Sequence, residues 1–71
     1  MRKIEALVFE APSKGKEAVL VKPFNYFLDA WRYAKEVTKG NYYEVIIRDD
    51  RTGNGDYLFC KITDGKYQGA I

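Results

Sequence analysis

The chain has 71 residues, of which 46% are hydrophobic and 31% charged, a composition typical of one small folded domain and not of a disordered tail. Its formal net charge of +2, with Lys and Arg scattered among acids, does not by itself indicate nucleic-acid binding. The single cysteine excludes an internal disulfide, and the lack of histidine argues against a closed zinc site. We therefore expect one domain over residues 1–71, with no metal and no cofactor.

No stretch of the sequence has the length and apolarity of a membrane span. The first residues, Met1 to Ile4, lead into no apolar segment with a cleavage site, so we expect no signal peptide. A lone cysteine without an export signal favours a reducing, cytoplasmic setting. A domain of this size buries only about 60% of its unfolded surface, so a second subunit is an expected means of stabilisation.

Two strands are predicted first, over residues 3–11 and 17–22. In the first, Ile4, Ala6 and Val8 alternate with Glu5, Leu7 and Phe9, which places the two sets on opposite faces. The segment 12–16 contains proline and glycine and is typical of a turn. We expect the second strand to return antiparallel and to end at Pro23, because proline cannot donate the next backbone hydrogen bond.

A helix is predicted over residues 25–39, with Asn25 as the N-cap and Gly40 at the C′ position. Apolar residues recur at intervals of three and four and so share one face, which we expect to be buried. This face comprises Phe27, Ala30, Trp31, Ala34 and Val37.

Further strands are predicted over residues 43–48 and 57–62, joined by a hairpin loop at 50–55. Asp64-Gly65 is a strong signal for a two-residue hairpin, and it implies a short fifth strand over residues 66–70. The predicted fold class is α+β, a two-layer ββαββ arrangement with one helix packed on an antiparallel sheet.

One helix can cover only one face of this sheet, so the other face is expected to expose apolar side chains. A patch of this kind on a small domain indicates a partner surface. The predicted function is a small non-enzymatic module that binds a protein partner or itself, as a homodimer, through an exposed sheet face or edge. The predicted contact residues are Tyr42, Ile46, Tyr57 and Phe59, with Arg48 and Lys61 at the rim.

The alternative is a small nucleic-acid-binding protein that stacks bases on the same aromatic and basic face. The size and the missing catalytic groups also fit an accessory protein of the phage or virus type that binds a host factor, an interpretation based on size alone.

Catalytic groups are scarce. Histidine is absent, the one serine, Ser13, lies in a turn, and Cys60 alternates with Leu58 and Ile62 and is expected in the core. Asp49, Asp50 and Asp56 are interpreted as strand-end and turn residues and not as a hydrolytic pair. The loop from Asp50 to Asp56 begins like a calcium loop, but Lys61 occupies the position that requires a glutamate. We favour a plain hairpin loop over weak cation binding there.

Overall fold

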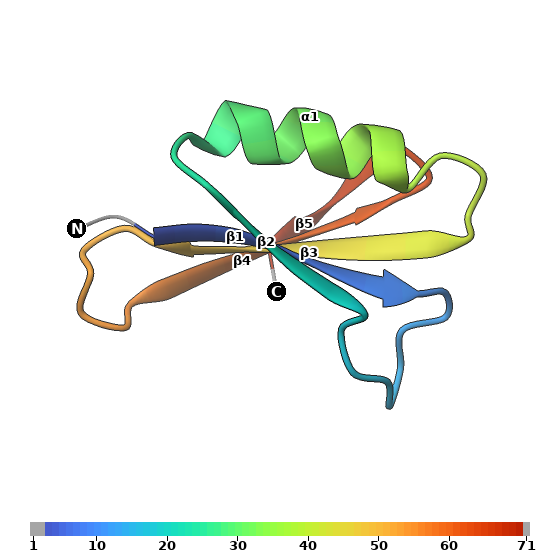
Figure 1. Ribbon diagram of the computed structural model, residues 1–71, viewed down its shortest axis with the longest axis horizontal. Coiled ribbons are helices and arrows are strands. Elements are labelled where there is room, and N and C mark those ends of the chain that lie inside the picture. The colour runs from blue at the N-terminus through green and yellow to red at the C-terminus, as the bar shows by residue number, and fades with distance from the viewer. Residues whose placement is uncertain (1–2, 71) are drawn as a thin grey trace.

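The computed structural model describes residues 3–70, which form five strands and one helix in two layers (Figure 1). The helix lies over one face of the sheet. The elements in chain order are β1 (Lys3–Glu10), β2 (Leu20–Phe24), α1 (Phe27–Val37), β3 (Tyr43–Asp50), β4 (Tyr57–Thr63) and β5 (Lys66–Ala70). The predicted α+β fold with an antiparallel sheet and a short fifth strand is confirmed.

The sheet has the order β2-β1-β3-β4-β5, and every neighbouring pair of strands is antiparallel. Two local units, β1–β2 and β3–β4–β5, meet along the central pair β1–β3, in which Lys3 lies opposite Asp50 and Glu10 opposite Tyr43. The turn between β4 and β5 consists of Asp64 and Gly65, both with positive φ (48° and 72°), as a two-residue hairpin requires.

The core lies between α1 and the sheet. Ala30 and Ala34 are one helical turn apart and fully buried, and their small size allows the helix to lie close to the strands. The strands contribute Ile4, Ala6, Val8, Val45, Ile47, Cys60 and Ile62. The predicted burial of Cys60 in the core is confirmed, with 3% of its surface exposed.

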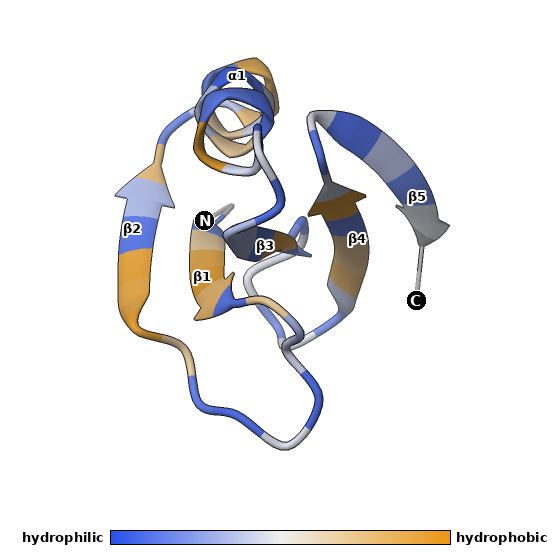
Figure 2. Ribbon diagram, turned by 90° about the vertical axis from the view of Figure 1, so that its right-hand side faces the viewer, coloured by the Kyte–Doolittle hydropathy of each residue, from blue (hydrophilic) through white to orange (hydrophobic). Residues whose placement is uncertain are grey.

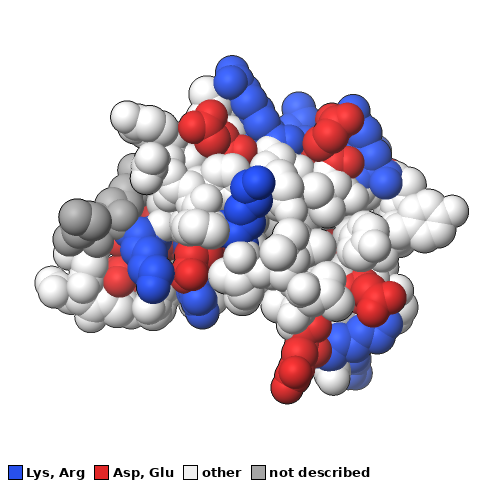
Figure 3. All heavy atoms as spheres, in the orientation of Figure 1, with Lys and Arg blue, Asp and Glu red and all other residues white. Residues whose placement is uncertain are grey.

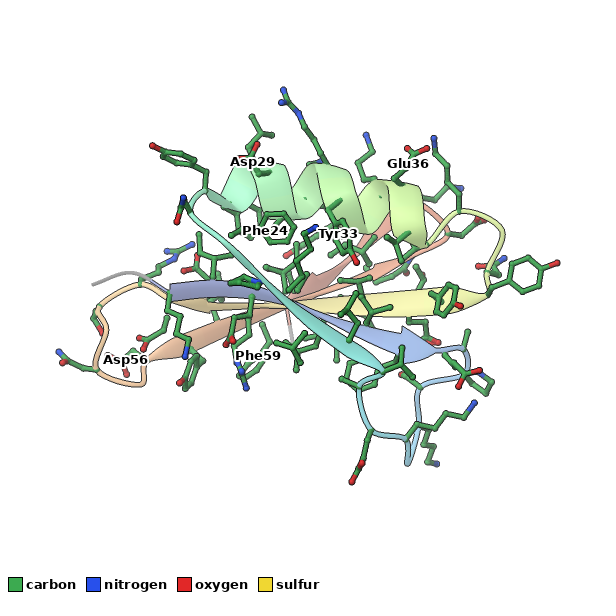
Figure 4. The ribbon with its side chains drawn as sticks, in the orientation of Figure 1. Phe24, Asp29, Tyr33, Glu36, Asp56 and Phe59 are labelled. Atoms are coloured by element: carbon green, nitrogen blue, oxygen red, sulfur yellow. The ribbon has the colours of Figure 1, made fainter. Side chains whose placement is uncertain are left out.

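Aromatic side chains close the two flanks of α1 in different ways. On the β2 flank, the rings of Phe24 and Tyr33 lie 5.4 Å apart beneath the helix, and Lys22 Nζ lies 5.2 Å from the centre of the Tyr33 ring (Figure 4). On the β5 flank, Trp31 contacts Tyr67 edge to face at 6.0 Å. Viewed along the helix, β5 curves away from α1 (Figure 2). The β5 flank is therefore the more open of the two.

The second strand pairs antiparallel with the first as predicted, but its predicted bounds are wrong. The strand β2 begins at Leu20 and continues through Pro23 to Phe24. Because β2 is an edge strand, it pairs with β1 on one side only, and a proline is tolerated where its missing N–H is not needed by a second neighbour.

The predicted helix caps are also wrong. The N-cap is Tyr26, not Asn25, and no side chain caps it, because β2 extends to Phe24 and the chain turns only at the two following residues. At the other end α1 stops at Val37, so Gly40 is not the C′ residue. The C-cap is Thr38, which is fully buried.

Thr38 links the end of the helix to the β4–β5 turn. Its Oγ1 donates a hydrogen bond to the Ala34 carbonyl oxygen at 2.8 Å and accepts one from the Gly65 N–H at 2.8 Å. One buried hydroxyl thus satisfies a backbone donor of the turn and holds the last hairpin against α1.

Candidate functional site

The face of the sheet that is turned away from α1 is called the open face. In the central strands β1, β3 and β4 it is formed by Lys3, Glu5, Leu7, Phe9, Glu44, Ile46, Arg48, Asp50, Tyr57, Phe59, Lys61 and Thr63. Figure 4 shows Phe59 on this side, opposite to Phe24 and Tyr33 on the helix side. The register explains the assignment, because these residues alternate along each strand with the residues that face α1, such as Ile4, Val45 and Ile62.

Five of the six predicted contact residues lie together on the open face. Arg48 lies opposite Phe59 and Ile46 lies opposite Lys61 across the β3–β4 pair. The Tyr57 and Phe59 rings are 5.9 Å apart, and Arg48 Cζ lies 5.5 Å from the centre of the Tyr57 ring. The prediction of an aromatic and basic cluster on one sheet face therefore matches the arrangement of these side chains.

Tyr42 is placed differently from the other five. It precedes β3, outside the sheet register, and 78% of its surface is exposed. Its carbonyl oxygen accepts a hydrogen bond from the Ala11 N–H at 3.0 Å, which fixes the backbone at that end of the sheet. Four residues along an extended strand separate it from Ile46, about 13 Å at the usual rise per residue.

Two apolar members of the open face were not among the predicted contact residues. Leu7 lies directly opposite Ile46, and Phe9 lies opposite Glu44. The alternation in the first strand had already assigned both to this face of the strand. Their position next to Ile46 depends on the β1–β3 pairing, which local sequence does not specify.

Two of the three cations of the open face, Arg48 and Lys61, are paired with acids of the same face, whereas Lys3 lies opposite Asp50 at the end of the face. Arg48 Nη2 lies 2.6 Å from Glu5 Oε1, and Lys61 Nζ lies 3.3 Å from Glu44 Oε1. These pairs bridge neighbouring strands. Ile46 and Phe59, which lie beside these pairs, are half-buried and not fully exposed.

Glu44 has a third partner from the β1–β2 loop. The Ser13 hydroxyl donates a hydrogen bond to Glu44 Oε1 at 2.9 Å, so this loop folds against one end of the open face. Burial raises the pKa of the Glu44 carboxyl, but the hydrogen bonds from Ser13 and Lys61 and the Lys61 charge outweigh burial and hold the pKa below its ordinary value. The carboxylate is therefore charged at neutral pH and keeps Lys61 paired.

The three aspartates around the β3–β4 loop do not converge. Asp49 faces α1, is fully buried and lies 3.7 Å from Arg51 Nε, whereas Asp56 is exposed in the loop (Figure 4). The Asp50 carboxylate accepts hydrogen bonds from the Gly53 and Gly55 N–H groups at 3.1 and 3.2 Å. Asp49 and Asp50 do lie at the end of β3 as expected, but both are buried, so the expected role as solvated strand-end acids is wrong.

The interpretation of residues 50–56 as a hairpin loop is supported by these bonds, since the first would-be calcium ligand organises the loop backbone instead. Within residues 3–70, no three His, Cys, Asp or Glu side chains lie together in a way that could hold a metal ion.

A second apolar surface lies on the β5 flank of α1. Phe27, Leu28, Trp31 and Tyr67 line an open groove of about 290 Å³. Phe27 and Trp31 were predicted as core residues, and both do pack against the core, but each also has a side that faces this groove. Desolvation by neighbouring groups and the Cys60 thiol raise the pKa of the Tyr67 hydroxyl.

Charges elsewhere are mixed. On the side where β2 crosses the front of the molecule, Lys and Arg alternate with Asp and Glu and form no broad patch of one sign (Figure 3). Over the described residues, α1 is too short and too polar to cross a membrane.

Comparisons with family models, with curated proteins and with solved structures gave no significant match to this chain.

Proposed function

We propose that the protein is a non-enzymatic interaction module and that its open face binds protein, with a second copy of the chain as the partner that fits this face best. The observation that carries the proposal is that Leu7, Phe9, Ile46 and Phe59 surround two ion pairs, Arg48 with Glu5 and Lys61 with Glu44, in the middle of the face. The face is therefore apolar and locally neutral.

Local neutrality favours self-association. Two copies can meet face to face without bringing unpaired like charges together, and packed sheets are separated by about 10 Å, a distance that apolar side chains of this size can fill. Burial of the face in a dimer would also enlarge the small core of a 71-residue domain.

The same pairing weakens the alternative of nucleic-acid binding through this face. Phosphate contacts require cations that can give up their existing partners, whereas Arg48 and Lys61 are each bonded to a glutamate. The aromatic rings remain suitable for stacking, but the electrostatic part of such binding would be small.

A non-enzymatic role is supported by the state of the nucleophiles. Cys60, the only thiol, is buried, and Ser13, the only serine, donates to a carboxylate whose pKa is low and which is therefore a weak base. The lone reduced cysteine in the core also supports an intracellular, cytoplasmic setting as part of the proposal.

The test is the solution mass from light scattering after size exclusion, over a concentration series at low and high salt. We expect a dimer, twice the 8.2 kDa of the chain, that persists at high salt. Phe59→Ala and Tyr57→Ala should shift the protein to monomer, whereas Tyr26→Ala, which removes an aromatic side chain 70% exposed on another surface, should not. A monomer at every concentration would contradict self-association.

The nucleic-acid alternative is tested with a labelled single-stranded oligonucleotide. Binding that weakens steeply as salt rises, and that Lys61→Ala reduces more than Phe59→Ala, would replace our proposal by the alternative.

A further inference from the structure

The connection between β1 and β2, residues 11–19, is called the strap. It has nine residues, more than the two to five or so that close most β-hairpins. Figure 1 shows the strap extending from the sheet on the side opposite α1. The strap therefore stands on the side of the open face, the surface for which we proposed self-association.

The strap takes a detour across the sheet before it reaches β2. In the strand order β2-β1-β3, a direct connection would stay on the β2 side of β1. The strap first runs toward β3, where the Ala11 N–H donates to the Tyr42 carbonyl oxygen at 3.0 Å. The Ser13 hydroxyl then donates to Glu44 Oε1 on β3 at 2.9 Å. From there the strap returns to β2, passing the strands on the side away from α1 (Figure 2).

One side-chain bond holds the strap against the open face. Within residues 3–70, the bond from Ser13 to Glu44 is the only side-chain hydrogen bond or ion pair that a strap residue forms. Residues 14–17 are exposed. At Gly15 the φ is 75°, and no atom lies within 4 Å of the position where a side chain would begin. The tip of the strap is therefore unpacked, and its position depends on Ser13.

The acceptor of this bond stays in place when the strap leaves. Glu44 is charged at neutral pH, which makes its bond to a hydroxyl stronger than a bond between neutral groups. Its carboxylate is also paired with Lys61 at 3.3 Å, and this pair lies within the sheet. Phe9, which is half-buried, lies opposite Glu44 in the β1–β3 pair. Opening of the strap would therefore clear the Phe9 end of the open face without disturbing the sheet.

We propose that the strap regulates self-association: when closed it blocks a second sheet at the Phe9 end of the open face, and when open it admits a second copy over the whole face. This inference rests on the proposed function. Packed sheets lie about 10 Å apart, so a loop that extends from one of them has to move before the other can reach that distance. The bond from Ser13 to Glu44 is the latch, and association has to break it in both copies.

The first test compares dimer dissociation constants, measured by light scattering over a concentration series. Because only the open form binds, the apparent affinity is reduced by the open fraction of each copy. Ser13→Ala removes the latch and should lower the dissociation constant by about tenfold or more, the factor that corresponds to one hydrogen bond to a charged group. Ser13→Thr keeps a hydroxyl at this position and should associate like the wild type.

Thr52→Ala is the matched control for the loss of a hydroxyl from a loop. The Thr52 hydroxyl accepts a hydrogen bond from the Asn54 N–H at 3.2 Å in the β3–β4 loop and has no part in the strap. This variant should also associate like the wild type. Circular dichroism verifies that all variants fold.

A second measurement follows the strap itself, at concentrations where the chain is monomeric. Lys14 and Lys16 are exposed and are sites for trypsin, which cleaves mobile loop segments fastest. Cleavage after these two lysines, followed by mass spectrometry, should be faster in Ser13→Ala than in the wild type. Ser13→Thr should be cleaved at the wild-type rate.

The outcomes separate the strap from self-association. If the wild type dimerises and Ser13→Ala has an equal or higher dissociation constant, the proposal is overturned while self-association stands. Equal cleavage of the strap in Ser13→Ala and the wild type would also overturn it, because the bond would then not restrain the loop. If the wild type and Ser13→Ala are both monomeric at every concentration, self-association is refuted and the regulatory role of the strap with it.

Discussion

Thr38→Val removes one hydroxyl while keeping the shape of a fully buried side chain. The Ala34 carbonyl retains its bond from the Thr38 backbone N–H at 3.1 Å, whereas the Gly65 N–H loses its acceptor at 2.8 Å. A buried donor without a partner costs about 1–3 kcal/mol, and Gly65 is only partly buried, so we expect a loss of about 2 kcal/mol. For a domain with about 4–10 kcal/mol of total stability, this is a large fraction.

The assay is urea unfolding followed by circular dichroism, with Thr38→Ser as the matched variant. Serine keeps both hydrogen bonds and loses one buried methyl group, about 1 kcal/mol, so its midpoint should lie between those of the wild type and Thr38→Val. Amide hydrogen exchange gives a local readout, since the Gly65 amide should lose protection in Thr38→Val and keep it in Thr38→Ser. A Thr38→Val protein as stable as the wild type, with Gly65 still protected, would refute the assigned role of the hydroxyl.

Three further predictions concern acid stability, the β3–β4 loop and the core. Because the folded-state pKa of Glu44 is below its ordinary value of 4.5, its contribution to stability is present above that pH and is lost as pH falls through the folded-state pKa. Urea midpoints of Glu44→Gln should therefore fall less than those of the wild type on acidification, and parallel curves would contradict this. Asp50→Ala should lower the melting temperature by about 4–8 °C per kcal/mol lost, with Asp50→Asn intermediate; equal melting of the two variants would show that the loop bonds contribute little. Ile47→Ala should cost about 2–5 kcal/mol and lower the urea midpoint strongly, and a variant with the midpoint of the wild type would place Ile47 outside the essential core.

Local patterns were sufficient to predict most elements. The three- and four-residue spacing from Phe27 to Val37 predicted the helix and its buried face, and Asp64-Gly65 predicted the last turn because its geometry needs two residues with positive φ. The alternation in the first strand predicted which side chains share a face, and in the structure Ile4, Ala6 and Val8 are buried together.

The errors arise where a residue's role depends on distant neighbours. From the local sequence, Pro23 was predicted to end the second strand. Its place within β2 follows only from the position of β2 at the edge of the sheet. The position of the helix end depends on Gly65, which lies far along the chain and hydrogen-bonds to Thr38. The burial of Asp49 and Asp50 was not predicted, because nothing local shows that β1 continues to pair with β3 as far as Lys3.

In the candidate site too, features set by the local sequence were predictable, whereas features set by distant neighbours were not. Tyr57, Phe59 and Lys61 share a face by alternation within one strand, so their association was predictable. The pairing of Arg48 with Glu5 joins two strands whose adjacency is a property of the whole sheet, and it converts an expected basic rim into a neutral one. The groove at Trp31 was not predicted, since the outward curve of β5 has no local signal in the sequence.

The central β1–β3 pair has a consequence for how the chain folds. The other strand pairs join neighbours in sequence, whereas this pair must bring residue 10 beside residue 43 with β2 and α1 in between. The entropy of closing that loop is lost before its contacts form, so we expect this step to limit the folding rate. Until β1 pairs with β3, the β1–β2 unit and the β3–β4–β5 unit each have apolar residues on both faces and no helix to cover them. The β1–β3 pairing that slows folding therefore also makes unfolding of the domain cooperative. Neither the β1–β2 unit nor the β3–β4–β5 unit can keep its structure after the two have separated.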